Sequence, residues 1–260
     1  MRKIILLCLF VFVPVNTWAS GGGHARLDSV NIDLGDKASL RRGAHTFINY
    51  CLSCHSARHM RYNRIARDLD IGDDIMKKNL MFTSDKVGSL MKAAMPVEDA
   101  IEWFGVTPPD LTLATRFRKP EWIYTYLRSF YRDNKSPSGW NNIVFENVSM
   151  PHVLYEWQGH QRIIYKDKKT MVHKKDKDGK TTMVEGSIKV FDRFEIDRPG
   201  TMDEGEFNAA MRDLTNFMVY LGDPARLVRY KIGAGVMVFL FIFLFVAYLL
   251  KKNFWRDIDH

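Results

Sequence analysis

The chain has 260 residues, of which 46% are hydrophobic and 13% aromatic, and it carries a formal net charge of +8. This length is enough to bury the core of one domain, with room for an insertion. Much of the excess charge lies in one stretch, residues 166–180, which has few interleaved aromatic residues. The composition therefore argues against a nucleic-acid-binding protein and favours a solvated loop or hairpin at this stretch.

The N-terminus has the three parts of a secretory signal peptide. Residues 1–3 (Met-Arg-Lys) are basic, residues 4–13 are apolar, and residues 17–19 (Thr-Trp-Ala) precede a cleavage point. The alternative is a buried N-terminal helix, but the apolar run is short and its flanks match a signal. We expect residues 1–19 to be removed on export.

Two helices and a turn are predicted in residues 39–112. Apolar residues recur at spacings of three and four in residues 39–59, which predicts a helix that runs through the cysteine motif. Residues 94–105 predict a short helix that ends at Gly105. Residues 106–112 contain paired prolines, which exclude a helix interior and predict a turn or extended segment.

The second half of the chain predicts further helices and one hairpin. Residues 120–131 predict a helix with proline in its first turn, and residues 133–142 predict a loop. Residues 161–196 predict a β-hairpin with a charged tip around Asp178-Gly179. Residues 201–221 predict a helix with a capping box formed by Thr201 and Glu204, ended by Gly222-Asp223-Pro224.

Residues 232–250 contain no charge and have about the length that a bilayer core requires. A buried soluble helix is the alternative, but the segment has no polar face at helical spacing. Basic residues follow it, as expected for a cytoplasmic tail. The expected organisation is a signal peptide (1–19), a periplasmic domain (20–228) containing the hairpin insertion (161–196), a transmembrane anchor (229–250) and a cytoplasmic tail (251–260).

Cys51, Cys54 and His55 form the pattern C-x-x-C-H, which is the attachment signature of haem c. On a helical turn, positions i and i+3 share a face, so both thiols can form thioethers to one haem. His55 follows directly and is placed to be the proximal iron ligand. The only other cysteine, Cys8, lies in the predicted signal peptide. The motif therefore predicts one covalently bound haem c.

Other uses of this motif fit less well. A zinc site needs a fourth ligand and more spacing between Cys54 and His55. A thioredoxin-like redox pair needs a βαβ setting, which the pattern does not indicate. A plain Cys51–Cys54 disulfide is the remaining structural alternative.

The second axial ligand of the iron is left open by the residues alone. Methionine in this position raises the reduction potential relative to a second histidine. Met95 and Met150 are both followed by proline, and such a segment could present a methionine to a metal. We favour Met150 because Met95 lies closer to a predicted helix start. His152 is also near and remains an alternative.

The ordered set of motifs resembles the cytochrome c1 family of bacteria. The resemblance rests on "LRRGAHTFINYCLSCHS", "FGVTPPDLTLATR", "WIYTYLRSFYRD", "PSGWNN", "NVSMPHVLYEWQG", "RDLTNFMVYLGDPA" and the single C-terminal anchor. It covers most of the chain after the signal peptide. It implies a mostly α-helical fold of the class I cytochrome c type, with a β-hairpin insertion and one C-terminal transmembrane helix.

The resemblance also implies roles for individual residues. Met150 would be the sixth iron ligand. Pro108 and Pro109 would lie against the haem, with a backbone carbonyl that accepts the ring N–H of His55. Arg116 or Arg118 would meet a haem propionate, with a slight preference for Arg118.

The implied function is electron transfer within the quinol–cytochrome c oxidoreductase, the cytochrome bc1 complex. The haem would accept an electron from the Rieske iron–sulfur protein and pass it to a soluble or tethered periplasmic c-type cytochrome. The chain would be a redox subunit that binds no quinol and is not an enzyme in isolation. Its partners would be cytochrome b, the Rieske protein and the lipid bilayer of the bacterial inner membrane, in a dimeric complex.

Two features depart from the family pattern. Some relatives contain an extra disulfide, for which this chain has no cysteines. Many relatives present an acidic face to a basic cytochrome c, whereas this chain is basic overall, so its acceptor could be acidic, tethered or docked through neutral contacts. The rival functions are a haem subunit of a terminal oxidase, a haem sensor or peroxidase, and a structural periplasmic domain with a disulfide.

Overall fold

The computed structural model describes residues 26–175 and 181–256, which form nine helices and six strands within these ranges. The helices are α2 (Lys37–Tyr50), α3 (Tyr62–Asp68), α4 (Asp73–Asn79), α5 (Val97–Phe104), α6 (Ala114–Phe117), α7 (Pro120–Arg128), α8 (Tyr155–Gln158), α9 (Glu204–Gly222) and α10 (Arg226–Phe254). The strands are β1 (Ala57–Arg61), β2 (Leu90–Met91), β3 (Phe130–Arg132), β4 (Trp140–Asn142), β5 (Gly159–Lys175) and β6 (Thr181–Pro199). The strands pair as three antiparallel two-stranded sheets, β1 with β2, β3 with β4, and β5 with β6. The prediction of a mostly helical fold with a hairpin is confirmed.

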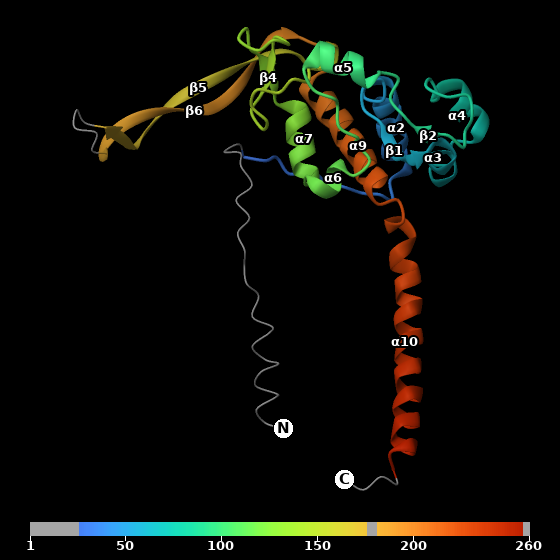
Figure 1. Cartoon of the computed structure of the whole chain (residues 1–260). Helices are drawn as coiled ribbons and strands as arrows, with labels where there is room; N and C mark the ends of the chain where they lie inside the picture. The colour runs from blue at the N-terminus through green and yellow to red at the C-terminus, as the bar shows by residue number, and fades with distance from the viewer. Residues whose placement is uncertain (1–25, 176–180, 257–260) are drawn as a thin grey trace.

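Helices α2 and α9 pack against each other at the centre of the domain (Figure 1). Leu40, Ala44 and Phe47 of α2 are fully buried, and Phe47 meets Phe217 of α9 with ring centroids 5.6 Å apart. The close approach depends on Gly43, because a Cβ atom there would lie 2.1 Å from the backbone oxygen of Asp213. This pair of helices fixes the end of α2, where the cysteine motif begins.

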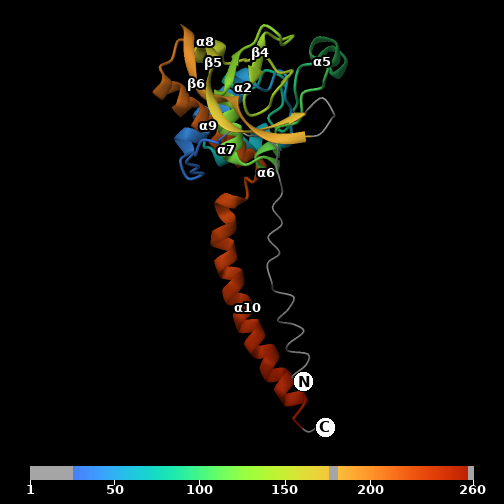
Figure 2. The ribbon, with the colours of Figure 1, turned by 90° about the vertical axis from the view of Figure 1, so that its left-hand side faces the viewer.

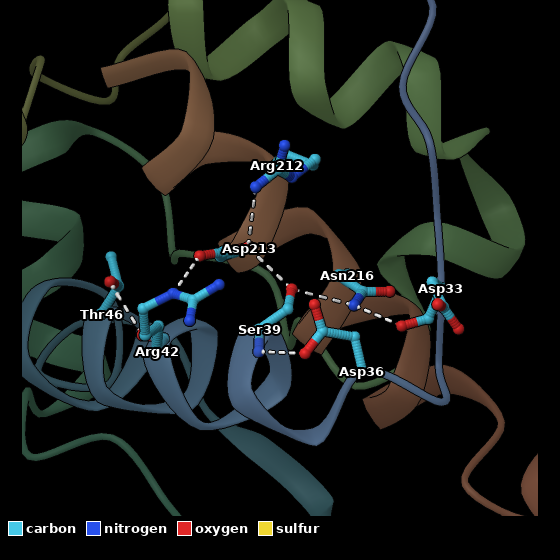
Figure 3. A network of polar contacts seen from close by, with 8 residues as sticks. All are labelled: Asp33, Asp36, Ser39, Arg42, Thr46, Arg212, Asp213 and Asn216. Carbon is cyan, nitrogen blue, oxygen red and sulfur yellow. Dashed lines mark hydrogen bonds and ion pairs between the residues drawn. The ribbon is translucent and has the colours of Figure 1, made fainter. Parts of the chain in front are cut away.

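A buried polar network joins the same two helices (Figure 3). The carboxylate of Asp213 accepts hydrogen bonds from Ser39 Oγ at 2.7 Å and from Arg42 Nε at 2.6 Å. Asn216 donates to Ser39 Oγ and to the carbonyl of Asp33. The carboxylate of Asp213 raises the pKa of Arg42 through its hydrogen bond, although burial acts in the opposite direction. A buried carboxylate requires such partners, so the network sets the register of α2 on α9.

The predicted helix over residues 39–59 is wrong in its second half. Helix α2 ends at Tyr50, residues 51–54 form turns, and β1 begins at Ala57. The strand pairs with β2, which comes from a distant part of the sequence. Local periodicity cannot anticipate a pairing of this kind.

Two further boundaries were also wrong. The predicted helix over residues 120–131 ends at Arg128, because Phe130–Arg132 pairs with Trp140–Asn142 as a small hairpin where a loop was predicted. The capping box of α9 uses Asp203 and Glu206, two residues beyond the predicted pair. The predicted helix end at Gly105, in the left-handed conformation with φ of 74°, and the end of α9 at Gly222 are confirmed.

The hairpin β5–β6 extends sideways from the helical body (Figure 1). Its base is held by Gln161, whose side-chain amide donates to the carbonyl of Phe130 at 2.5 Å and to that of Arg128 at 3.0 Å. Gly159 has φ of 89° at the start of β5, where a Cβ atom would lie 2.3 Å from the Arg198 carbonyl oxygen. The predicted tip at Asp178-Gly179 lies outside the described residues.

Helix α10 leaves the domain from the end of α9 and extends well beyond it (Figure 2). Val228–Phe254 is, by length and composition, the one stretch of the described residues that could cross a membrane. Its side chains from Val236 to Leu250 are exposed, as expected for a lipid-facing helix. The predicted signal peptide, residues 1–19, lies outside the described ranges.

Candidate haem site

The cysteine motif forms a tight loop at the end of α2. Cys51 is the C-cap of the helix, and its N–H donates to the Phe47 carbonyl at 2.9 Å. The N–H groups of Cys54 and His55 both donate to the Cys51 carbonyl, at 3.1 Å and 2.8 Å. The two cysteines are free thiols. These hydrogen bonds continue the turn of α2, so both sulfurs and the imidazole lie in one short segment.

The proline segment packs against this loop. His55 Nδ1 lies 2.8 Å from the carbonyl oxygen of Pro109, so the ring N–H donates to it when the proton is on Nδ1. The N–H of Leu111 donates to the Ser56 carbonyl at 2.8 Å. The hydrogen bond expected between His55 and the segment containing Pro108 and Pro109 is thus present. It leaves Nε2 as the nitrogen available to a metal.

Asp110 holds the proline segment in place. Its carboxylate accepts hydrogen bonds from the Arg58 N–H at 2.8 Å and from the Thr112 N–H and hydroxyl at 2.9 Å and 2.6 Å. Burial alone would raise the pKa of Asp110, but these hydrogen bonds lower it below its ordinary value. The carboxylate is therefore ionised at neutral pH and ties both sides of the His55 contact together.

Burial determines the protonation of the motif. It lowers the pKa of His55, against the opposing effects of the Pro109 carbonyl and the Asp110 charge, so the imidazole is neutral near pH 7. Burial and the neighbouring Cys54 raise the pKa of Cys51 to about 12. Cys51 is thus a thiol rather than a thiolate. Within the described ranges, no group of three or more His, Cys, Asp or Glu side chains is arranged to hold a metal ion.

Met95 and Met150 occupy different surroundings. The N–H of Met95 donates to the Ser53 carbonyl at 3.1 Å, so Met95 lies beside the cysteine loop itself. Met150 packs on a separate buried cluster of Phe130, Trp140 and Val148. Its Sδ accepts a hydrogen bond from the Tyr126 hydroxyl at 3.3 Å.

His152 is enclosed by aromatic rings. Only 2% of it is exposed, it stacks on Phe130 with centroids 5.0 Å apart, and the Trp140 ring meets it edge-on. Burial lowers its pKa to about 4, with a further lowering by His160 and an opposing effect of Gln158. Within the described residues, His152 Nε2 has no hydrogen-bond partner. These contacts make it a packed, neutral side chain beside Met150.

The two candidate arginines differ in their contacts. The guanidinium of Arg118 lies 4.7 Å from the centroid of the Trp122 ring and 5.1 Å from that of Phe117. Arg116 is exposed on α6. The stacking orients Arg118, whereas the described residues show no comparable ring contact for Arg116.

Tyr126 and Trp122 were not singled out from the sequence. They lie one turn apart on α7 and stack with an interplanar angle of 9°, and Tyr126 also meets Phe130 edge-on. The signal was present as the aromatic spacing 122, 126 and 130.

The residues present fit a covalent haem. Two free thiols lie on one turn, a neutral imidazole has one nitrogen fixed by a carbonyl, and a methionine sulfur lies in an apolar cluster with a hydroxyl donor. These are the donor types that haem c uses. Together with helix α10, which is long and apolar enough to cross a membrane, they are the features of a c-type cytochrome.

Comparisons with known proteins identify the family. A model described as the cytochrome C1 family matches residues 31–180. The chain is 45% identical over 258 residues to cytochrome c1 of Allochromatium vinosum, covering 99% of this chain and all of that protein. It is 42% identical, over 99% of this chain and all of the relative, to a protein of Nitrosomonas europaea named ammonia monooxygenase gamma subunit. It is 23% identical to the cytochrome b/c1 protein of Bradyrhizobium diazoefficiens, over 94% of this chain and 36% of that protein. The chain belongs to the cytochrome c1 family, and this membership implies a haem c.

Proposed function

We propose that this chain is the haem-bearing electron-transfer subunit of a quinol–cytochrome c oxidoreductase. It takes one electron from a Rieske iron–sulfur protein and passes it to a periplasmic c-type cytochrome. The observation that carries the proposal is the C-x-x-C-H loop, whose histidine is tied to Pro109, in a member of the cytochrome c1 family. The chain breaks no bond in quinol and is a redox subunit rather than an enzyme in isolation.

Each residue of the loop has a distinct role in this proposal. Cys51 and Cys54 attach the haem by thioethers, and His55 Nε2 ligates the iron. The bound haem supplies a one-electron couple at the iron. The Pro109 carbonyl fixes the orientation of His55 and raises its basicity as a ligand. Two protein ligands held by the fold would keep the rearrangement during electron transfer small.

Met150 is the proposed second axial ligand. A second iron ligand would have to come from a segment other than the one that supplies His55. Met95 is bonded through its backbone to Ser53 of the cysteine loop, which favours a position on the histidine side. Met150 comes from a separate segment, and Tyr126 orients its sulfur. The stacked guanidinium of Arg118 is the proposed partner of a haem propionate, with Arg116 as the alternative.

The topology follows from the two ends of the chain. We propose that residues 1–19 are removed and that residues 20–228 form a periplasmic domain. Residues 229–250 cross the inner membrane, and residues 251–260 are cytoplasmic. The similarity to a protein named cytochrome b/c1 supports association with cytochrome b, in a dimeric complex with the Rieske protein.

Part of the basic net charge lies away from the cysteine loop, whereas acidic residues lie near it. Lys166, Lys168 and Lys169 lie on β5, in the hairpin that extends away from the body. Helix α5 begins two residues after Met95 and has three acidic residues, Glu98, Asp99 and Glu102, next to exposed Ile101 and Trp103. This face suits a basic acceptor cytochrome, which is the usual electrostatic arrangement in the family.

A second candidate function comes from the Nitrosomonas europaea relative, whose name assigns it to ammonia monooxygenase. In that case the chain would be an electron-transfer subunit of a different membrane enzyme. The C-x-x-C-H loop and the anchor are compatible with either assembly. The proteins that accompany the chain decide between them.

Native purification from the membrane is the experiment that tests the function. We expect a covalent haem with a low-spin spectrum, recovery with cytochrome b and the Rieske protein, and reduction of this haem on addition of quinol. Recovery with a haem-copper oxidase or an ammonia monooxygenase, without cytochrome b, would contradict the proposal. Carbon monoxide binding by the native reduced protein would instead favour a sensor or peroxidase. A haem-free chain with a disulfide would favour a structural domain.

A further inference from the structure

A cavity of about 530 Å³ lies where the domain meets the membrane helix. One wall comes from β1 and α3, with Arg61, Arg64 and Arg67 among its residues. Another wall comes from the end of α9 and the residues that follow it, including Leu221 and Pro224. The cavity therefore joins a cationic wall to an apolar one directly above α10.

The position of the cavity is set by the short connection between α9 and α10. Pro224 precedes the first residue of α10 by two positions, and the uncharged stretch begins at Ile232. Eight residues at about 1.5 Å each place the cavity on the order of 10 Å from the start of the apolar segment. The headgroup zone on each side of a bilayer is roughly 5–8 Å thick, so the cavity lies just outside it.

The cavity is strongly cationic. None of the described residues that line it carries a carboxylate. Arg64 and Arg67 share the carboxylate of Asp68, which accepts from Arg64 Nε at 3.0 Å, Arg67 Nε at 3.2 Å and the Tyr220 hydroxyl at 2.9 Å. Asp223, next to the lining residues Gly222 and Pro224, is paired with Arg229. Burial would raise the pKa of Asp68, but its hydrogen bonds from Arg64 and Tyr220 outweigh that effect and lower it. Asp68 is thus one negative charge among three guanidinium groups.

Each of the three arginines has a hydrogen-bond acceptor, and each keeps further N–H donors. Arg64 and Arg67 each use Nε toward Asp68, and Arg61 donates one N–H to the Gly88 carbonyl. A guanidinium has five N–H donors, so most remain for a further acceptor. The side chain of Arg67 is 72% exposed, which leaves it accessible from the solvent side. Phosphate oxygens are the acceptors that guanidinium groups match best.

We propose that this cavity binds the phosphodiester headgroup of an anionic phospholipid from the outer leaflet of the membrane that α10 crosses. Arg61, Arg64 and Arg67 contact the phosphate, and Leu221, Pro224 and Leu113 contact the glycerol carbons beside it. The lipid then links α3 to the base of the anchor and fixes the angle between the domain and the membrane. Inorganic phosphate carries the negative charge of the headgroup but has no carbon atoms to contact the apolar wall of the cavity.

Native mass spectrometry of the full-length protein, purified in detergent with its accompanying subunits, tests this site. The probes are phosphatidylglycerol, phosphatidylcholine with the same acyl chains, and inorganic phosphate. We expect preferential retention of phosphatidylglycerol. In the double variant Arg61→Gln/Arg67→Gln its affinity falls by roughly tenfold or more, because two surface cations are lost. The matched control, Arg162→Gln/Arg193→Gln, removes two arginines of the β5–β6 hairpin and retains the lipid.

The haem spectrum and the thermal unfolding temperature show that the variants are folded. Equal retention of phosphatidylcholine and phosphatidylglycerol would overturn the proposal, as would equal losses in the cavity variant and the control. Binding of inorganic phosphate as tightly as phosphatidylglycerol would assign the cavity to a soluble anion and overturn the lipid assignment.

Discussion

The Tyr126 hydroxyl donates a hydrogen bond to the Sδ atom of Met150 at 3.3 Å. Tyr126 lies on α7, where it stacks on Trp122 and packs against both hydrophobic clusters of the domain. The contact therefore connects the proposed axial methionine to a rigid helix. A donor on the sulfur withdraws electron density from it, which makes Met150 a weaker donor to ferric iron.

Replacing Tyr126 with phenylalanine tests this contact. We expect Tyr126→Phe to keep the covalent haem and the low-spin spectrum. Its reduction potential should fall by roughly 20–40 mV, the equivalent of about 0.5–1 kcal/mol for a hydrogen bond lost from the ligand sulfur. A redox titration measures the change, and Tyr124→Phe on the same helix is the control. An unchanged potential in Tyr126→Phe would show that the hydroxyl does not act on the ligand.

The thiols of Cys51 and Cys54 are expected to act as independent attachment points. Each single serine variant should retain haem through one thioether, whereas Cys51→Ser/Cys54→Ser should carry no haem after denaturing electrophoresis. Intact mass measurement checks each species, and Ser53→Ala in the same loop is the control. A wild-type chain with a Cys51–Cys54 disulfide and no added haem mass would refute covalent attachment.

The packing of α2 on α9 should be intolerant of any side chain at Gly43. The added Cβ would lie 2.1 Å from the Asp213 carbonyl oxygen and 2.7 Å from the Cβ of Phe217. The helices must separate, so Gly43→Ala should destabilise the domain by about 1–3 kcal/mol or more in denaturant unfolding. The control is Gly88→Ala, where a Cβ meets no atom within 4 Å. Comparable losses at both positions would rule out the packing explanation.

The buried His152 should make the stability of the domain depend on pH. Its folded pKa of about 4 lies below the unfolded value of about 6.5. The unfolded state therefore binds the proton first, and stability falls as the pH is lowered from about 6.5 to about 4. A shift of this size corresponds to on the order of 3 kcal/mol. His152→Phe keeps the stacking on Phe130 and should remove most of this slope in unfolding experiments.

Exposed His45 provides the comparison for that experiment. The same substitution, His45→Phe, replaces a histidine that is exposed in the folded state. In His45→Phe, the stability of the domain should still fall as the pH is lowered. A slope that is equal in His152→Phe and in the wild type would place its origin in other groups.

The sequence was sufficient for the features that depend on local chemistry. The spacing of Cys51, Cys54 and His55 predicted the haem motif, and Gly105 and Gly222 predicted helix ends that the structure confirms. The charge-free stretch within α10 predicted a helix long enough to cross a membrane. The hairpin was predicted from alternation and its turn, although β5 and β6 extend two and three residues further at its base.

The features that failed depend on partners distant in the sequence. The helix predicted through the cysteine motif ends at Tyr50, because Ala57–Arg61 pairs with a strand about thirty residues later. Phe130–Arg132 forms a strand where the helix was predicted to continue, for the same reason. The contact between Tyr126 and Met150 joins segments 24 residues apart and could not be read from either one. The basic cavity likewise combines β1, α3 and the end of α9.

The spectrum and reduction potential of the full-length haem protein in the variants Met150→Leu and Met95→Leu test the central claim most directly. We predict that Met150→Leu keeps its covalent haem but loses the sulfur-to-iron charge-transfer band, binds carbon monoxide when reduced, and falls in potential by on the order of 100 mV. Met95→Leu should match the wild type in all three measurements. The account is contradicted if Met150→Leu retains the wild-type spectrum and potential, and a loss of both in Met95→Leu would assign the ligand to Met95.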